Sequence, residues 1–186
     1  MSDTHVHLRG FDTPSRATSR FSVSEEFGQG LPSNTLIAYT DGSCTTNQGS
    51  GGWGLRLIFI NSLRQGFVRD IHGGAPKQTN NTMELMAIKA ALVIASQCHQ
   101  PAIIYSDSKY AIGCLTKWSS SWARNDWRNS KGKPVSNKEL IQTMLHLVTD
   151  NVKIAWVKGH AGHMHNEAAD ALANKGRAAF GGGNGQ

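Results

Sequence analysis

The sequence predicts an α/β domain in which helices pack on a mixed β-sheet. Three strand patterns with short links come first, over residues 35–41, 53–61 and 65–72, and they indicate an antiparallel meander. Further along, strand patterns alternate with helical patterns, which is typical of α/β folds with parallel strands. A hydrophobic content of 39% in 186 residues suits one domain with a modest tail.

The later elements are predicted from local signals. Polar residues 79–81 can cap a helix over 83–98, and Pro101 separates that helix from a buried-type strand over 102–107. We find no internal repeat. The remaining expected elements are helices over 110–118, 137–149 and 166–179, and a strand over 151–160 that precedes the closing helix.

Both ends of the chain are expected to lie outside the folded domain, which spans residues 35–180. Residues 1–34 show no sustained period and are often interrupted by Gly, Ser, Thr and Pro. We therefore predict a mostly disordered extension, with a short amphipathic piece near residues 21–27. Glycine-rich residues 181–186 should fray. Removal of residues 1–30 is expected to leave the stability of the domain almost unchanged.

Basic charge is concentrated in the predicted domain. Residues 1–34 carry three basic and four acidic side chains, whereas residues 35–186 carry sixteen basic and nine acidic ones, a net charge of +7. This excess favours a polyanionic partner, although basic proteins without nucleic-acid ligands are common. No apolar run is long enough to span a membrane, and the acidic N-terminal segment lacks the apolar region of a secretory signal.

Cysteine usage indicates a reducing compartment. Cys44, Cys98 and Cys114 are odd in number and lack CxxC spacing. A disulfide framework or a cysteine-based zinc site is therefore disfavoured, and we expect a cytoplasmic location.

Four acidic residues occupy positions where a carboxylate is costly to bury. Asp41 and Asp107 each follow a buried-type strand. Because ligands bind at the carboxyl ends of parallel strands, we expect these two side chains at one crevice. Glu84 heads the apolar stripe of its helix, and Asp170 lies among alanines in the last helix.

A cluster of these acids would require a cation. Any one of them could be an ordinary helix cap or surface residue, but four like charges repel strongly in a low-dielectric crevice. All-oxygen ligation indicates Mg²⁺ or Mn²⁺ rather than zinc. Glu167, one turn before Asp170, adds a carboxylate near the same helix face. A zinc site at His160, His163 and His165 is an alternative, although no cysteine or acid spacing completes it.

Four sequence blocks together resemble ribonuclease H of type 1, the bacterial-type enzyme. The blocks are TDGSC with GSGGWG, TNNTMELMA, YSDSKY and WVKGHAGHMHNEAADALA, and they cover about residues 36–178 in the family's order. The resemblance implies a ribonuclease H-like α/β fold with a five-stranded mixed sheet, in which three antiparallel strands precede two parallel ones and helices cover both faces. It also implies a monomeric endonuclease that hydrolyses the RNA strand of RNA–DNA hybrids and leaves 5′-phosphate and 3′-hydroxyl ends.

The resemblance assigns roles to the acids. It implies that Asp41, Glu84, Asp107 and Asp170 hold two Mg²⁺ ions, for which Mn²⁺ can substitute, and that Asp41 touches both. His160 matches a mobile histidine that assists proton transfer or product release, and Glu167 matches an acid near the first metal. Two ions can activate water and stabilise both the phosphate charge and the leaving oxygen, so no protein nucleophile is required.

Substrate contacts follow from the same resemblance. Short polar side chains suit recognition of RNA 2′-hydroxyls, which requires close approach to the backbone. Lysine at position 77 keeps the charge of the arginine that is frequent there but loses its bidentate fork. The implied contacts are Cys44, Asn47, Asn80 and Asn81 in the minor groove, Thr79, Asn137 and Lys77 at a phosphate of the DNA strand, and Lys109, where the family commonly has glutamine, near the RNA strand.

Residues 117–134, here called the basic protrusion, interleave three tryptophans with five basic residues and match the handle of the bacterial-type enzyme. We expect the tryptophans mostly to pack a small core and the basic groups to bind phosphates, with a marked salt dependence. The expected contacts are Trp118, Arg124, Arg128 and Lys131.

Two other functions are weighed against the nuclease. A catalytically silent hybrid-binding module would be expected to have lost at least one carboxylate, and all four are present. A ribonuclease H domain of a mobile-element protein is the second alternative, against which the compact chain with its own protrusion argues. Met164 replaces a frequent proline, so the segment 160–166 is expected to be more mobile than usual.

Overall fold

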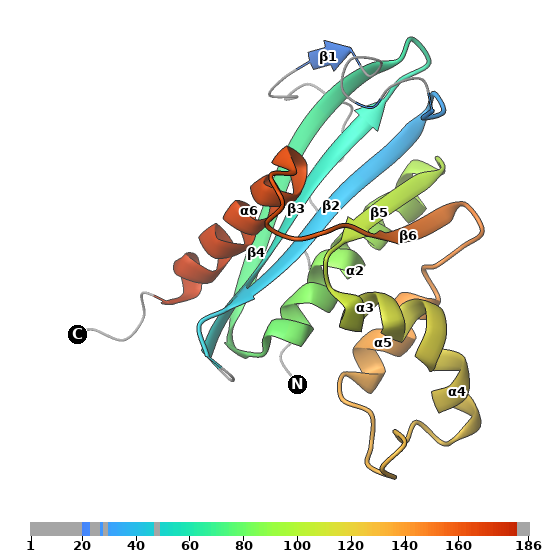
Figure 1. Ribbon diagram of the computed structural model, residues 1–186, viewed down its shortest axis with the longest axis vertical. Helices are drawn as coiled ribbons and strands as arrows, with labels where there is room; N and C mark the ends of the chain where they lie inside the picture. The colour runs from blue at the N-terminus through green and yellow to red at the C-terminus, as the bar shows by residue number, and fades with distance from the viewer. Residues whose placement is uncertain (1–19, 23–26, 28–29, 47–48, 182–186) are drawn as a thin grey trace.

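A six-stranded mixed sheet forms the centre of the computed structural model, which describes residues 20–22, 27, 30–46 and 49–181 (Figure 1). The strand order is β1-β4-β3-β2-β5-β6. Strands β2, β3 and β4 pair antiparallel, whereas β5 pairs parallel with both β2 and β6. The strands are β1 (Arg20–Ser22), β2 (Thr35–Cys44), β3 (Gly49–Ile60), β4 (Gln65–Gln78), β5 (Ala102–Ser106) and β6 (Val152–Trp156).

The sheet has one strand more than the five that were expected. The three antiparallel and two parallel strands are present, and β1 adds a short antiparallel strand on the outer edge of β4. It comes from residues 1–34, most of which lie outside the described residues. A three-residue strand is too short to produce an alternating pattern. It forms here because β4 offers an edge with free hydrogen-bonding groups.

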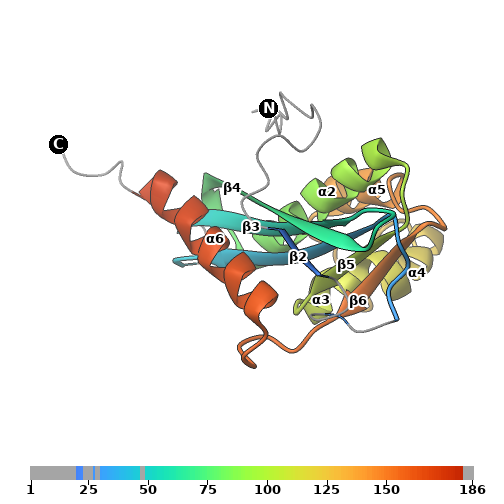
Figure 2. The same ribbon diagram turned by 90° about the horizontal axis from the view of Figure 1, so that it is seen from above.

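Helices cover both faces of the sheet, as expected. Figure 2 shows α6 (Met164–Gly181) across one face and α2 (Asn80–Cys98) on the other. The remaining helical segments pack on the α2 side. They are α3 (Lys109–Gly113), the π-helical turn η1 (Cys114–Trp118), α4 (Ser119–Arg124) and α5 (Lys138–Leu145).

Helix α2 begins where polar side chains can cap it. The side chain of Thr79 accepts a hydrogen bond from the amide of Thr82, which satisfies one of the free N–H groups of the first turn. The helix therefore starts at Asn80, three residues before the predicted start. Its apolar stripe is buried against the sheet, and Glu84 is buried with it.

Strand β2 continues past Asp41 to Cys44, although the sequence predicted that it ends at Asp41. Pairing with β5 stops at Thr40, whereas pairing with β3 runs on through a glycine-rich stretch. Glycine is depleted in strands, so this stretch was expected to be a loop. Here Gly52 and Gly54 allow close packing, because a Cβ at either position would overlap the backbone of α6.

The sheet has a core on each face. The larger core lies between β2, β3, β5 and α2 and extends to α3 and α5. The smaller core contains Ala169 of α6 and side chains of β2, β3 and β4, and Phe21, Phe27 and Leu31 pack against it. The N-terminal segment thus contributes side chains to the second core.

Among the described residues, no helix is long and apolar enough to cross a membrane.

Candidate active site

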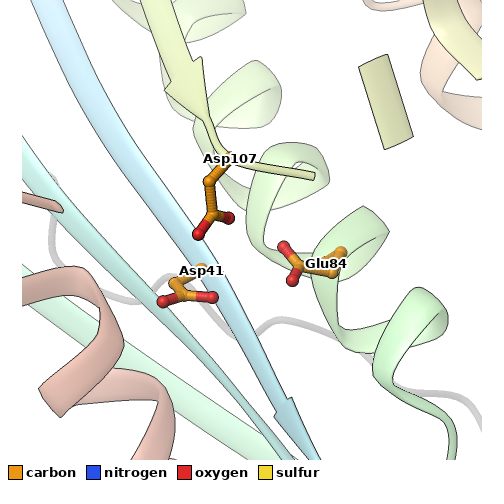
Figure 3. Close-up of side chains that lie close together, drawn as sticks. All are labelled: Asp41, Glu84 and Asp107. Carbon is orange, nitrogen blue, oxygen red and sulfur yellow. The ribbon is translucent and has the colours of Figure 1, made fainter. Parts of the chain in front are cut away.

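Three carboxylates from different elements converge at one point, as Figure 3 shows. Asp41 lies on β2, Glu84 in α2 and Asp107 directly after β5, and one oxygen of each lies within 4.8 Å of the other two. The parallel pairing of Thr40 with Ser106 places both aspartates one residue beyond the last pair of these strands. We call these three residues the carboxylate cluster.

A glycine brings Glu84 to the strand. A Cβ on Gly42 would overlap the backbone N and Cα of Glu84, so the first turns of α2 lie directly on β2 at this point. The amide of Gly42 also donates a hydrogen bond to Oδ1 of Asp41, at 2.7 Å. The TDGSC block therefore positions two carboxylates, one on its own strand and one on the helix above it.

Among the described residues, the basic groups near the carboxylate cluster do not balance its negative charge. Burial, reinforced by Asp41 and Asp107, raises the pKa of Glu84 to about 9. Burial, with Asp107 and Asp170, raises the pKa of Asp41 to about 7, and the Gly42 amide and His160 only partly oppose this. Burial is also the main cause of the raised pKa of Asp107.

The unbalanced donors suit a divalent cation. Asn80 donates a long hydrogen bond of 3.5 Å to Oε1 of Glu84, while Oε2 of Glu84 is buried without a hydrogen-bond partner. A buried polar atom without a partner is costly, and a cation would satisfy it. The donors are all carboxylate oxygens, which Mg²⁺ and Mn²⁺ prefer.

Asp170 lies beside the carboxylate cluster but outside its tight group. Its charge raises the pKa of Asp41 and of Asp107. Its Oδ1 accepts a hydrogen bond of 3.0 Å from Nδ2 of Asn174, one turn further along α6.

Ser43 holds Asn174, and Arg177 in turn holds Ser43. Oδ1 of Asn174 accepts from the Ser43 hydroxyl at 2.8 Å, and Arg177 donates to the same hydroxyl at 2.8 Å. Sequence reasoning missed this network. The four-residue spacing of Asp170 and Asn174 is a helical signal that could have found the first contact, whereas no local pattern joins Ser43 to α6.

His160 and Glu167 are both exposed. His160 has a positive φ of 50° in the connection between β6 and α6, and its charge lowers the pKa of Asp41 and Asp107. Glu167 lies in the first turn of α6. Neither residue belongs to the carboxylate cluster.

The alternative zinc site is not supported by the geometry. The ring of His163 lies 5.0 Å from that of Tyr39, and the ring of His165 lies 5.2 Å from it. In the described part of the chain, the carboxylate cluster is the only group of His, Cys, Asp or Glu with ligand atoms close enough to share an ion.

The residues expected in the minor groove surround one hollow. Cys44, Thr46, Thr79, Asn80 and Asn81 line an open volume of about 380 Å³, here called the polar hollow. The Cys44 thiol lies within hydrogen-bonding distance of backbone carbonyls of Thr46 and Gln78, at 2.9 and 3.1 Å. Asn47, which was expected in this group, lies outside the described residues.

Two of the three residues expected at the DNA-strand phosphate, Thr79 and Asn137, are connected through Thr82. Hydroxyls of Thr79 and Thr82 lie 2.8 Å apart, and Thr82 donates to Oδ1 of Asn137 at 3.2 Å. Nδ2 of Asn137 donates to the Tyr110 hydroxyl at 3.4 Å. Sequence reasoning missed Thr82 and Tyr110. Lys77 is exposed, near the end of β4, with a positive φ of 54°.

A lysine and a tryptophan flank Asp107. The Lys109 ammonium lies 5.2 Å from the centre of the Trp156 ring, within the range of a cation–π interaction. The Trp156 indole donates to the backbone oxygen of Asp107 at 3.2 Å, although half of this side chain is exposed. Met164, the first residue of α6, is also exposed.

The tryptophans of the basic protrusion form a row of rings. Adjacent centroids of Trp118, Trp122 and Trp127 lie 5.8 and 6.2 Å apart. Trp122 and Trp127 pack against the larger core, as expected, while Trp118 is 41% exposed. Arg124, Arg128 and Lys131 are exposed on the same segment.

Fold and site together define a protein of the ribonuclease H class. The RNase H family model matches residues 33–178, and the chain belongs to this family, which confirms the resemblance seen in the sequence. The segment before residue 33 lies outside the match.

Individual relatives agree. A protein named Ribonuclease H from Legionella pneumophila (strain Lens) is 44% identical over 140 residues, which cover 74% of this chain and 93% of the relative. A Ribonuclease H from Francisella philomiragia is 44% identical over 144 residues, covering 76% and 90%. The crystal structure of LC9-RNase H1, described as a type 1 RNase H with the type 2 active-site motif, is similar with a TM-score of 0.69 and 28% identity, covering 80% of this chain and 74% of that one.

Proposed function

We propose that this protein is a ribonuclease H, an endonuclease that hydrolyses the RNA strand of RNA–DNA hybrids with the help of divalent metal ions. The observation that carries the proposal is the carboxylate cluster, whose oxygens lie within 4.8 Å of one another in a chain of the RNase H family. The names of the relatives support the same activity. A silent hybrid-binding module would not need to retain such a costly cluster.

Asp41, Glu84, Asp107 and Asp170 would hold two Mg²⁺ ions, or Mn²⁺ in their place, with Asp41 shared between them. When bound, such ions supply a nucleophile at neutral pH and Lewis-acid stabilisation of the charge that develops on the phosphate. Asn174 and Ser43 orient Asp170 through the hydrogen bonds described above.

His160 is the side chain that we expect to transfer a proton during the reaction. It is exposed beside the carboxylate cluster, so it can reach a bound phosphodiester and return to solvent. We propose that it delivers a proton to the leaving 3′ oxygen, which yields 3′-hydroxyl and 5′-phosphate ends. Glu167, exposed one turn before Asp170, would lie near the first metal.

The polar hollow suits the minor groove of the hybrid. Its short polar side chains can approach 2′-hydroxyls closely, and Asn47 would join them. Thr79 and Asn137, joined by Thr82, would hold a DNA-strand phosphate with Lys77 nearby. Lys109, held over Trp156, would lie near the RNA strand.

Substrate choice tests the proposal. We expect the RNA strand of a hybrid to be cleaved at least about 100-fold faster than the same strand in an RNA duplex, because Thr79 and Asn137 would bind a phosphate of a DNA strand. The measurement is single-turnover cleavage of one labelled RNA oligonucleotide paired with either DNA or RNA. Equal rates on the two duplexes would show that the proposed specificity is wrong.

The basic protrusion is expected to bind by charge. Replacing Arg124, Arg128 and Lys131 together with glutamine should raise KM and reduce the slope of log KM against log salt by about 2–3, because each phosphate contact contributes about 0.7–0.9. Lys153→Gln, which removes an exposed positive charge on β6 outside the protrusion, is the control and should leave the salt slope nearly unchanged. An unchanged salt slope in the triple variant would contradict this role.

We also propose that residues 35–180 are the catalytic domain and that the protein acts as a monomer in the cytoplasm. Cys44, Cys98 and Cys114 are all free thiols, which is consistent with a reducing compartment.

A further inference from the structure

The N-terminal segment covers part of the sheet face that carries α6. In the β1–β4 pair, Phe21 lies opposite Gly66, and a Cβ on Gly66 would overlap the Phe21 ring. Phe21 contacts Phe27, with ring centroids 6.3 Å apart. Both pack with Leu31 against the smaller core. The described residues of this segment therefore fill space that a bare sheet would expose to water.

One of these contacts reaches the start of α6. The Phe27 ring stacks on that of His165, with centroids 5.6 Å apart and planes inclined by only 10°. His165 is buried and also packs on Tyr39, at 5.2 Å. It is the second residue of α6 and lies midway in sequence between His160 and Asp170.

Another ring neighbour of His165, Tyr39, leads to the carboxylate cluster. Tyr39 lies on β2, two residues before Asp41. The contacting rings of Phe27, His165 and Tyr39 thus join the N-terminal segment to the strand that carries Asp41 and to the helix that carries Asp170. Since packed side chains fix one another's positions, loosening one end of this row of rings should loosen the other.

Backbone contacts hold the segment to the domain. All three residues of β1 pair with β4. Arg64, in the turn between β3 and β4, donates a hydrogen bond to the backbone oxygen of Leu31. The family match begins at residue 33, so these contacts belong to a part of the chain that the family match does not include.

We propose that Phe21, Phe27 and Leu31 form an intramolecular brace that positions the connection carrying His160 and the first turn of α6. Phe27 is a positioning residue that acts through His165. Its catalytic consequence rests on the ribonuclease function proposed above, whereas its mechanical consequence does not. These contacts also argue against the expectation that removal of residues 1–30 leaves stability almost unchanged, because that removal would take Phe21 and Phe27 from the smaller core and uncover the His165 ring on which Phe27 stacks.

The test replaces Phe27 with alanine in the full chain. We expect the melting temperature to fall by about 3–6 °C, since a half-buried ring is lost. The Glu167 amide, which donates to the His163 carbonyl in the first turn of α6, should exchange its hydrogen at least about tenfold faster. On the hybrid, kcat should fall by roughly tenfold with KM within about twofold of wild type, because misplaced catalytic groups affect the chemical step.

Two further variants make the result specific. Leu63→Ala removes an apolar side chain that is 75% exposed in the turn between β3 and β4, and it should change none of the three quantities. Phe27→Leu keeps much of the apolar volume without the aromatic stack, and it should recover most of the melting temperature but not the slow exchange of the Glu167 amide. It also provides the exchange measurement should the alanine variant fail to fold.

Contrary outcomes separate the brace from the nuclease. Unchanged exchange of the Glu167 amide in both Phe27 variants would overturn the brace, and so would a loss of activity confined to KM. A wild-type protein that fails to cleave the hybrid would instead contradict the proposed function, and the exchange and melting measurements would still test the brace.

Discussion

Replacing Asp41 with asparagine is expected to abolish hydrolysis of the hybrid while leaving the fold intact. Asparagine has nearly the same volume, but it lacks the charge that two ions would share. We expect the single-turnover rate in Mg²⁺ to fall by roughly 10³-fold or more, equivalent to about 4 kcal/mol of transition-state stabilisation. The melting temperature without metal should rise, because the change removes repulsion with Asp107 and Asp170 and the cost of burying the charge.

Asp150→Asn, in the exposed turn before β6, is the matched control and should retain wild-type activity. An Asp41→Asn variant with undiminished Mg²⁺-dependent cleavage would rule out the carboxylate cluster as the catalytic centre. A variant that loses activity because it unfolds would be recognised by its lower melting temperature.

Replacing Glu84 with glutamine is expected to stabilise the metal-free protein in a pH-dependent way. Glu84 is 6% exposed, and its pKa of about 9 in the fold lies above its ordinary value of 4.5. Because the folded state binds the Glu84 proton more tightly than the unfolded state does, this proton stabilises the fold. The stabilisation is fully present below pH 4.5 and is lost as pH rises through 9. At pH 7 the loss amounts to about 3 kcal/mol, which the glutamine variant avoids.

The measurement is the free energy of unfolding of both proteins in EDTA across this pH range. The advantage of Glu84→Gln should be near zero at pH 4.5 and should grow until about pH 9. Glu139→Gln, on the exposed side of α5, should show no such trend. Mg²⁺ should stabilise the wild type more than the glutamine variant, since a ligand that binds only the folded state stabilises it. A pH-independent difference would contradict the burial of an unbalanced carboxylate.

The carboxylates were predictable because each stands out locally. Asp41 and Asp107 follow buried-type strands, and Glu84 interrupts an apolar stripe, so single-element patterns were enough to expect their convergence. How they converge was not predictable. The close approach of α2 to β2 at Gly42 depends on the packing of two elements that lie far apart in sequence, and no local pattern reports such a contact.

Contacts between distant segments account for what the sequence did not predict. The hydrogen bond of Ser43 with Asn174 spans 131 residues. The extension of β2 past Asp41 depends on pairing with a stretch of β3 that contains Gly52 and Gly54, which allow α6 to pack closely on the sheet. Strand β1 and the stack of Phe27 on His165 come from a segment without a sustained periodic pattern, because a few aromatic side chains that pack on an existing sheet do not require one.

Cleavage of a hybrid with a labelled RNA strand, in Mg²⁺ or in EDTA, tests the central claim most directly. The carboxylate cluster predicts RNA fragments with 3′-hydroxyl ends in Mg²⁺, an intact DNA strand, and no cleavage in EDTA. Cleavage that persists in EDTA, or an RNA strand that stays intact in Mg²⁺, would contradict a metal-dependent ribonuclease H.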